Sequence, residues 1–141
     1  MSQNYKNHRR FVPSFHFVTT PILVAVLIGA IVNLINASSE TIYSASLILV
    51  LTLVVISVFF HARIFALKAQ NRAIRAEENF RHFILTGAQL DTRLRMEQII
   101  ALRFASDAEF PALAQRAISE NLSNDAIKRS IKNWRADYNR V

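Results

Sequence analysis

The sequence predicts an all-α membrane protein in which a two-helix transmembrane hairpin is followed by a long membrane-proximal helix and a small cytosolic three-helix module. Residues 42–60 form an uncharged run of 19 residues, and a second apolar stretch covers residues 17–35. Each run is long enough for an α-helix to cross a hydrocarbon core of about 30 Å, where only a helix satisfies its own backbone polar groups. The few polar residues between the runs match a tight helix–helix connection, so we expect a hairpin over residues 17–62.

The first apolar run also has the outline of a secretory signal peptide, because the basic segment 1–16 precedes it. The run is longer than the usual apolar region of a signal peptide. A cleavage site would also need a small residue where Ile35 stands, two positions before Ala37. A retained span is therefore the favoured interpretation.

Basic residues flank both spans and are absent from the connecting loop, whose charged residue is Glu40. Lys and Arg near the ends of spans stay on the cytoplasmic side, so we expect both termini to be cytosolic in a bacterial inner membrane. The basic side chains after the second span are expected at the membrane surface, against anionic lipids: Arg63, Lys68, Arg72 and Arg75.

The spans carry no ionisable side chain, so the charges at depth that proton relays and voltage sensors need are missing. Ala25, Gly29 and Asn33 follow one another at four-residue spacing on the first span. Small residues at this spacing let two helices approach closely, and Asn33 can add an interhelical hydrogen bond. Packing within the hairpin is favoured over a contact between two copies.

Two histidines, His16 and His61, stand at the ends of the spans that a hairpin brings to one membrane face. Paired imidazoles can ligate haem or a metal, but an amphipathic ring at the water boundary is also an ordinary anchor. The anchor is the favoured interpretation, and no cofactor or metal is expected.

The composition limits the chemistry of the chain. Its 141 residues carry a formal net charge of +7, with no cysteine and two glycines. Thiolate nucleophiles, cysteine–zinc sites and disulfides are excluded, as are glycine-rich phosphate loops. No group of nucleophile, base and orienting residue can be named, so we expect a protein that is not an enzyme.

A long helix is predicted over residues 63–86, because the segment is rich in helix formers and has no Pro or Gly before Gly87. Phe60, Ile64, Leu67 and Ile74 have the spacing of the start of a coiled-coil seam. Asn71 and Glu78 interrupt this spacing, so the pattern supports a coiled coil only weakly.

Residues 87–141 are expected to form the three-helix module, with a first helix over residues 92–104. Ser106 and Glu109 have the spacing of a capping box for the second helix, and Ser123 is expected to cap a third that continues through DAIKRSIKNWRADYNRV. The expected core consists of Met96, Ile99, Ile100, Phe104, Leu113, Ile127, Ile131, Trp134 and Tyr138.

The third helix allows an alternative function, because a capped helix with basic residues beside its apolar stripe can lie in a nucleic-acid groove. The residues that would contact phosphates are Lys128, Arg129, Lys132 and Arg135. The same pattern arises whenever a helix buries one face and solvates the rest. Nucleic-acid binding is therefore kept as the alternative.

Three segments resemble a family of small bacterial two-span membrane proteins that is classed only as a domain of unknown function: QNYKNHRRFVPSFHF, QIIALRFASDAEFPALAQRA and ENLSNDAIKRSIKNWRADYNRV. The resemblance runs nearly end to end and implies an uncharacterised integral membrane protein. It implies no catalytic residue, cofactor or partner.

The favoured function is that of a noncatalytic membrane-anchored adaptor or small accessory subunit of a membrane protein complex. Its expected partners are the lipid bilayer with its anionic lipids, and a partner protein or further copies of the chain.

Overall fold

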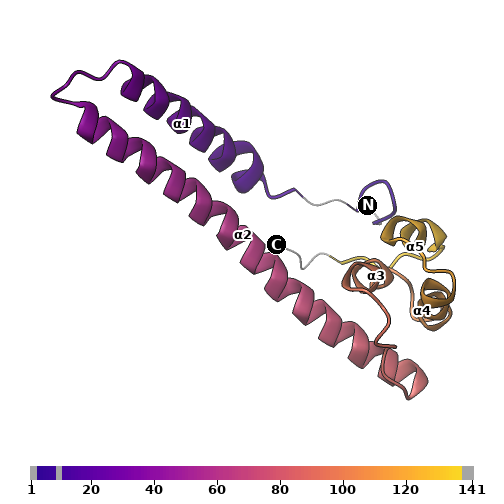
Figure 1. Cartoon of the computed structure of the whole chain (residues 1–141). Coiled ribbons are helices and arrows are strands. Elements are labelled where there is room, and N and C mark those ends of the chain that lie inside the picture. The colour runs from indigo at the N-terminus through magenta and orange to yellow at the C-terminus, as the bar shows by residue number, and fades with distance from the viewer. Residues whose placement is uncertain (1–2, 9–10, 138–141) are drawn as a thin grey trace. The chain divides into compact units, whose positions relative to one another are not determined.

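The computed structural model describes residues 3–8 and 11–137, and within them the fold is all-helical apart from one isolated β-bridge (Figure 1). The elements, in chain order, are η1 (Ser14–Thr19), α1 (Thr20–Ile35), α2 (Ile42–Thr86), α3 (Met96–Leu102), α4 (Phe110–Ser119) and α5 (Asn124–Ser130). They form two compact units. The hairpin unit is Phe11–Ala66, and the packed unit combines Met1–Arg10 with Leu67–Val141.

In the hairpin unit, α1 runs antiparallel to the first half of α2, as the two apolar runs predicted (Figure 1). A π-helical turn, η1, leads into α1, which has a proline in its first turn, where the missing N–H costs little. The Phe15 ring stacks on Phe59 with centroids 4.4 Å apart, and the Arg63 guanidinium lies 5.3 Å from the Phe15 ring. Arg63 therefore belongs to the base of the hairpin.

The stripe of Ala25, Gly29 and Asn33 does not take part in packing within the hairpin, contrary to the expectation. All three residues are exposed, and a Cβ added at Gly29 would meet no atom within 4 Å. The buried positions of the hairpin include Ala30 and Ala45, which are 4% and 1% exposed. An almost uniformly apolar helix gives no amphipathic signal for the face that packs, so the sequence did not distinguish Ala30 from its neighbour Gly29.

The predicted long helix is confirmed as the second half of α2, a single helix of 45 residues. It ends where Gly87 adopts a φ of 74° and donates its N–H to the Phe83 carbonyl at 2.8 Å. Ile74, expected in a weak coiled-coil seam, is 7% exposed and lies in the core of the packed unit.

The core of the packed unit is centred on α3, which packs against α4 and α5. Of the predicted core residues, Ile99, Phe104, Leu113, Ile127 and Ile131 are buried, and Met96, Ile100 and Trp134 are half-buried against them. The buried Gln98 is satisfied, because its Nε2 donates to the Ala117 and Leu122 carbonyls at 3.1 and 2.9 Å. Tyr138 lies outside the described residues.

The last helix is shorter than predicted, since α5 ends at Ser130 and residues 131–137 are not helical. Ser123 caps its start as expected, accepting from the Ala126 N–H at 3.2 Å. Beyond α5 the chain forms a bridge between Trp134 and Ala105, and the Arg135 N–H donates to the Phe104 carbonyl at 2.8 Å.

Glu109 explains why the tail leaves the helix. Its carboxylate accepts the backbone N–H groups of Lys132 and Asn133 at 3.2 and 3.1 Å, and the Asn133 side-chain amide at 2.9 Å. The predicted capping box is therefore wrong: Glu109 binds the tail, and the Ser106 hydroxyl makes no hydrogen bond among the described residues.

Candidate functional site

The packed unit contains an ion-pair cluster centred on Arg81 of α2, in which Arg81 and Glu78 are largely buried and Asp107 is exposed. The Arg81 guanidinium donates to Glu78 Oε2 at 2.9 Å, to Asp107 Oδ1 at 2.7 Å and to the Ala105 carbonyl at 2.7 Å. Its Cζ also lies 4.5 Å from the centre of the Phe110 ring. Glu78 is only 5% exposed, and an unpaired carboxylate at such a position would be costly. The cluster ties α2 to the chain between α3 and α4.

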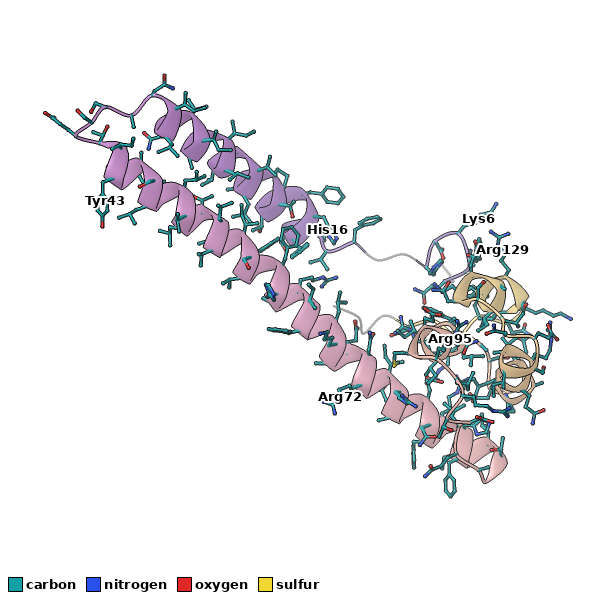
Figure 2. The ribbon with its side chains drawn as sticks, in the orientation of Figure 1. Lys6, His16, Tyr43, Arg72, Arg95 and Arg129 are labelled. Atoms are coloured by element: carbon teal, nitrogen blue, oxygen red, sulfur yellow. The ribbon has the colours of Figure 1, made fainter. Side chains whose placement is uncertain are left out.

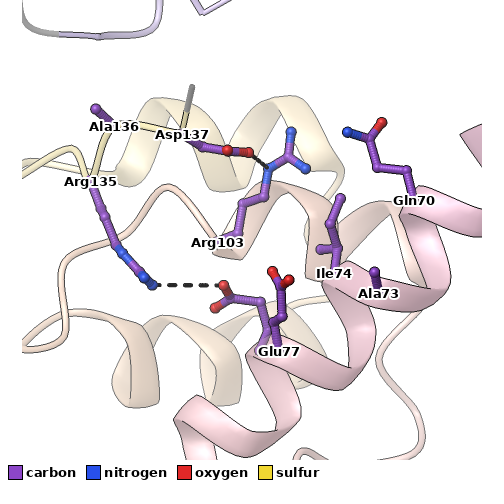
Figure 3. A pocket seen from close by; sticks show the side chains of 9 residues that line it. Gln70, Ala73, Ile74, Glu77, Arg103, Arg135, Ala136 and Asp137 are labelled. Atoms are coloured by element: carbon purple, nitrogen blue, oxygen red, sulfur yellow. Dashed lines mark ion pairs between the residues drawn. The ribbon is translucent and has the colours of Figure 1, made fainter. Parts of the chain in front are cut away.

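A pocket of about 370 Å³ lies beside this cluster (Figure 3). Across it, Arg103 Nε lies 3.2 Å from Asp137 Oδ2, and Arg135 Nη1 lies 3.8 Å from Glu78 Oε1. Glu78, Arg103, Arg135 and Asp137 thus face opposite charges from other segments, whereas Glu77, which also lines the pocket, forms no ion pair among the described residues. Among the described residues that line it, none is Ser, Thr, Lys or His, so the pocket offers no side-chain nucleophile other than carboxylates.

A second groove, of about 690 Å³, lies between α2 and the segment that leads into α3. The predicted basic residues Lys68, Arg72 and Arg75 line one side of it, and Leu90, Met96 and Ile99 are among the apolar residues of the lining. Asp91 also lines the groove, but it accepts from Arg93 at 2.7 Å, and this hydrogen bond lowers the pKa of Asp91 to about 2. The groove is positively charged overall.

The segment 3–8 belongs to the packed unit, although no pattern in the sequence predicts this. The Tyr5 hydroxyl donates to Asp125 Oδ1 at 2.6 Å, and the Asp137 N–H donates to Gln3 Oε1 at 2.8 Å. The His8 ring lies 5.8 Å from the Trp134 ring. The hydrogen bond from Tyr5 is the main reason that the pKa of Asp125 is lowered.

The candidate nucleic-acid contacts do not form one helical face. Lys128 and Arg129 lie on α5, where Lys128 Nζ is 3.3 Å from His8 Nε2 and Arg129 Nε donates to the Tyr5 hydroxyl at 3.1 Å. Lys132 and Arg135 lie on the tail, beyond the end of the helix. A groove-reading helix carrying all four residues is therefore not what the chain forms.

In the described part of the chain, no group of three or more His, Asp or Glu side chains could hold a metal ion. His16 Nδ1 contacts the Val12 carbonyl at 3.0 Å and His61 Nδ1 contacts the Ser57 carbonyl at 2.8 Å, each within its own segment.

These observations define an all-helical protein in which two helices, Ser14–Ile35 and Ile42–Thr86, are long and apolar enough to cross a membrane. The chain belongs to the DUF6526 family of unknown function, and the match covers residues 1–141. The resemblance to an uncharacterised family is thereby confirmed. No curated protein and no solved structure matches the chain.

Proposed function

We propose that the protein is a noncatalytic membrane-anchored adaptor or small accessory subunit, whose hairpin crosses the inner membrane and whose packed unit contacts a partner protein in the cytosol. The observation that supports it most is the exposure of the hairpin. In the first helix, only 6% of the most apolar 18-residue stretch is buried. In the second helix, 11% of the corresponding stretch is buried. In Figure 2 the side chains along both helices extend outward without cover.

This exposure favours a membrane span over the core helix of a soluble protein, which would be mostly buried. Among the bare side chains are Ile22, Leu51 and Val58, which are 57%, 63% and 62% exposed. Soluble proteins rarely expose a continuous apolar surface of more than a few hundred Å². Lipid removes this surface from water, and the internal hydrogen bonds of each helix satisfy the backbone.

The segments that make up the packed unit support a topology in which both ends of the chain lie on the same side of the membrane. The chain leaves this unit after Arg10, passes through the hairpin unit and returns at Leu67. Segment 3–8 contacts α5 and the tail, so it must lie on the same side of the membrane as they do. The basic residues beside both spans favour the cytosol as that side. These contacts also support a retained first span, because cleavage would remove Tyr5 and Gln3.

The adaptor role is supported by the way the charges of the packed unit are used. Glu78, Arg81 and Asp107 form a structural cluster, and Arg103 and Arg135 face acidic partners. A small helical unit that includes the second half of α2 provides surfaces for another protein. These charge pairs support a role in binding over a role in catalysis.

Cysteine labelling tests the topology, because the chain has no native cysteine. We expect Ser38→Cys, in the loop, to react with a membrane-impermeant maleimide in intact cells. The matched variant Ser119→Cys, exposed at the end of α4, should react only after the cells are opened. Labelling of Ser119→Cys in intact cells would contradict the orientation, and release of the protein by alkaline carbonate would contradict insertion.

Purification of the full-length chain in a mild detergent tests the adaptor role. We expect another protein to co-purify in fixed proportion and to stay bound in raised salt and after nuclease treatment. Binding that nuclease or salt removes would favour the nucleic-acid alternative, since phosphate contacts weaken steeply with ionic strength. A chain that purifies without any other protein would contradict the adaptor role.

A further inference from the structure

The face of α2 that lies away from the core of the packed unit carries an exposed apolar seam, in which Ala73 borders the 370 Å³ pocket and Ala76 borders the groove. The seam consists of Ala69, Ala73, Ala76, Phe80 and Phe83, all of which are exposed. Phe80 and Phe83 are 66% and 49% exposed, large values for phenylalanine side chains on a folded unit. At 100° per residue the seam lies away from Ile74, Glu78 and Arg81, which face the core and the ion-pair cluster.

The seam has the spacing of a coiled coil. Its residues follow one another at intervals of four, three, four and three, a repeat of 3.5 residues that keeps one face toward a partner helix. This face of α2 is not the one that carries the weak coiled-coil pattern of Ile64, Leu67 and Ile74. That pattern leads to Ile74, which is buried in the core. Alanine at three of the positions lets a second helix approach closely, and the two phenylalanines add apolar area at the end of the seam.

Lipid does not account for the seam. Phe80 lies 20 residues beyond Phe60, the last residue of the uncharged run, which corresponds to about 30 Å along a continuous helix. That length equals the thickness of the whole hydrocarbon core. A hydrocarbon layer that holds residues 42–60 therefore does not reach Phe80.

Two charges beside the seam indicate what covers it. Arg72 and Glu77 flank the seam on opposite sides, at the positions called g and e in a heptad, and Figure 2 shows Arg72 extending outward from α2. Neither forms an ion pair or side-chain hydrogen bond with any residue of the described ranges, 3–8 and 11–137. In a parallel pair of helices a g residue meets the e residue five positions further along the partner. Arg72 of one copy then meets Glu77 of a second copy, and the reciprocal pair forms by symmetry.

We propose that the seam is the interface of a parallel homodimer, in which the α2 helices of two copies pack along Ala69–Phe83 and are held in register by two Arg72–Glu77 pairs. The parallel direction rests on the proposed membrane anchoring, which gives both copies the same orientation. An antiparallel pair would place g beside g and e beside e, so Arg72 would not meet Glu77. The second copy is thus the occupant whose charges match the seam.

Single cysteines test the interface in the full-length protein in membranes. Ala69→Cys and Ala76→Cys should each form disulfide-linked dimers on mild oxidation, because in a parallel pair every seam residue meets its own counterpart. Arg75→Cys, exposed on the same helix but off the seam, is the matched control and should cross-link at least several-fold less. In an antiparallel pair, Ala69→Cys and Ala76→Cys cannot both form dimers when each variant is tested alone. If cross-linked dimer appears only when chains with Ala69→Cys are mixed with chains with Ala76→Cys, the proposal is overturned. So would the absence of cross-links at either position.

Charge reversal tests the register in the Ala69→Cys background. Arg72→Glu and Glu77→Arg should each lower the yield of cross-linked dimer several-fold, because each sets like charges against one another. The double variant should restore it. Unchanged yields in both single variants would overturn the assigned register. Trp134 fluorescence should stay constant throughout, since the seam is not part of the core.

The same membranes separate this proposal from the proposed anchoring. If alkaline carbonate releases the protein while both single-cysteine variants still cross-link, the anchoring fails and the dimer stands. If the protein stays in the membrane and neither variant cross-links, the dimer fails and the anchoring stands.

Discussion

Arg81 shows at the scale of a single residue how the packed unit holds a buried charge. Its guanidinium is satisfied by two carboxylates and one carbonyl, and it also covers the face of Phe110. Taking Glu78 out of water is costly, and this cost is offset by Arg81, hydrogen-bonded at 2.9 Å, and by Arg135, whose Nη1 lies 3.8 Å from the carboxylate. Because the members of the cluster come from α2 and from the residues before α4, its formation requires both segments to be in place.

We predict that Arg81→Ala destabilises the packed unit by about 3 kcal/mol, the lower end of the cost of breaking a buried ion pair, because Arg135 still lies near Glu78. Chemical denaturation followed by Trp134 fluorescence measures this change. Arg93→Ala is the matched control, because Arg93 pairs with Asp91 at the surface, and it should change stability little. Equal effects of the two substitutions would show that Glu78 is not held by Arg81.

Trp134 was expected to be buried in a helix, and it is half-buried in the tail. Its ring lies 5.2 Å from that of Phe104 and close to that of His8. The apolar spacing identified the residue correctly as a member of the core, although its backbone is not helical.

We predict that Trp134→Ala costs roughly 2 kcal/mol, less than the 3–5 kcal/mol of a fully buried aromatic. The wild-type emission should lie between that of a buried and that of a fully hydrated indole. Lys132→Ala, which removes an exposed side chain two residues away, should leave the denaturation midpoint nearly unchanged. Emission as red as free indole would contradict the contact with Phe104.

At the scale of elements, what the sequence predicted well was local. Both apolar runs became helices, α2 continues without a break to Gly87, and Ser123 caps α5. Propensity, apolar length and capping act between neighbouring residues, so they can be read in one pass along the chain.

The errors of prediction come from contacts between distant residues. Glu109 accepts from Lys132 and Asn133, more than twenty positions away, and the tail is drawn out of the helix that its spacing favours. Segment 3–8 joins the packed unit through residues that carry no local signal. Of the candidate sites, the sequence identified the basic residues of the groove but contained no local signal for the Arg81 cluster, which α2 and the residues between α3 and α4 build together.

We predict that Glu109→Ala frees the tail and leaves α5 intact. The lost carboxylate bonds are worth about 2 kcal/mol to the tail, so amide exchange over residues 132–135 should become much faster while that of Ile127 changes little. Glu120→Ala, which removes a surface carboxylate at the end of α4, is the control. Unchanged exchange in the tail would show that the bridge between Trp134 and Ala105 holds it alone.

Considering the molecule as a whole, the packed unit is assembled from segments that precede and follow the hairpin in the sequence. The segment 87–141 holds α3, α4 and α5, but Ile74, Glu78 and Arg81 come from α2, and Tyr5 comes from the other end of the chain. About 55 residues without a disulfide or metal bury little apolar surface, and stability is marginal at that size. The second half of α2 is therefore part of the fold of the packed unit and not only a connection to it.

We predict that the excised segment 87–141 shows little amide protection over α3, that segment 67–141 regains most of it, and that the full-length protein in detergent shows the most. The first gain comes from the core contact of Ile74 and the Arg81 cluster, and the second from the bonds of segment 3–8. Introducing Arg81→Ala into segment 67–141 should abolish most of the first gain, which separates the ion-pair cluster from a general effect of chain length. Equal protection of Ile99 in the shortest segment and the full-length protein would mean that the three short helices fold without α2. In that case Glu78 would be buried because α2 packs against an already folded module, and its ion pair with Arg81 would not be needed for that module to fold.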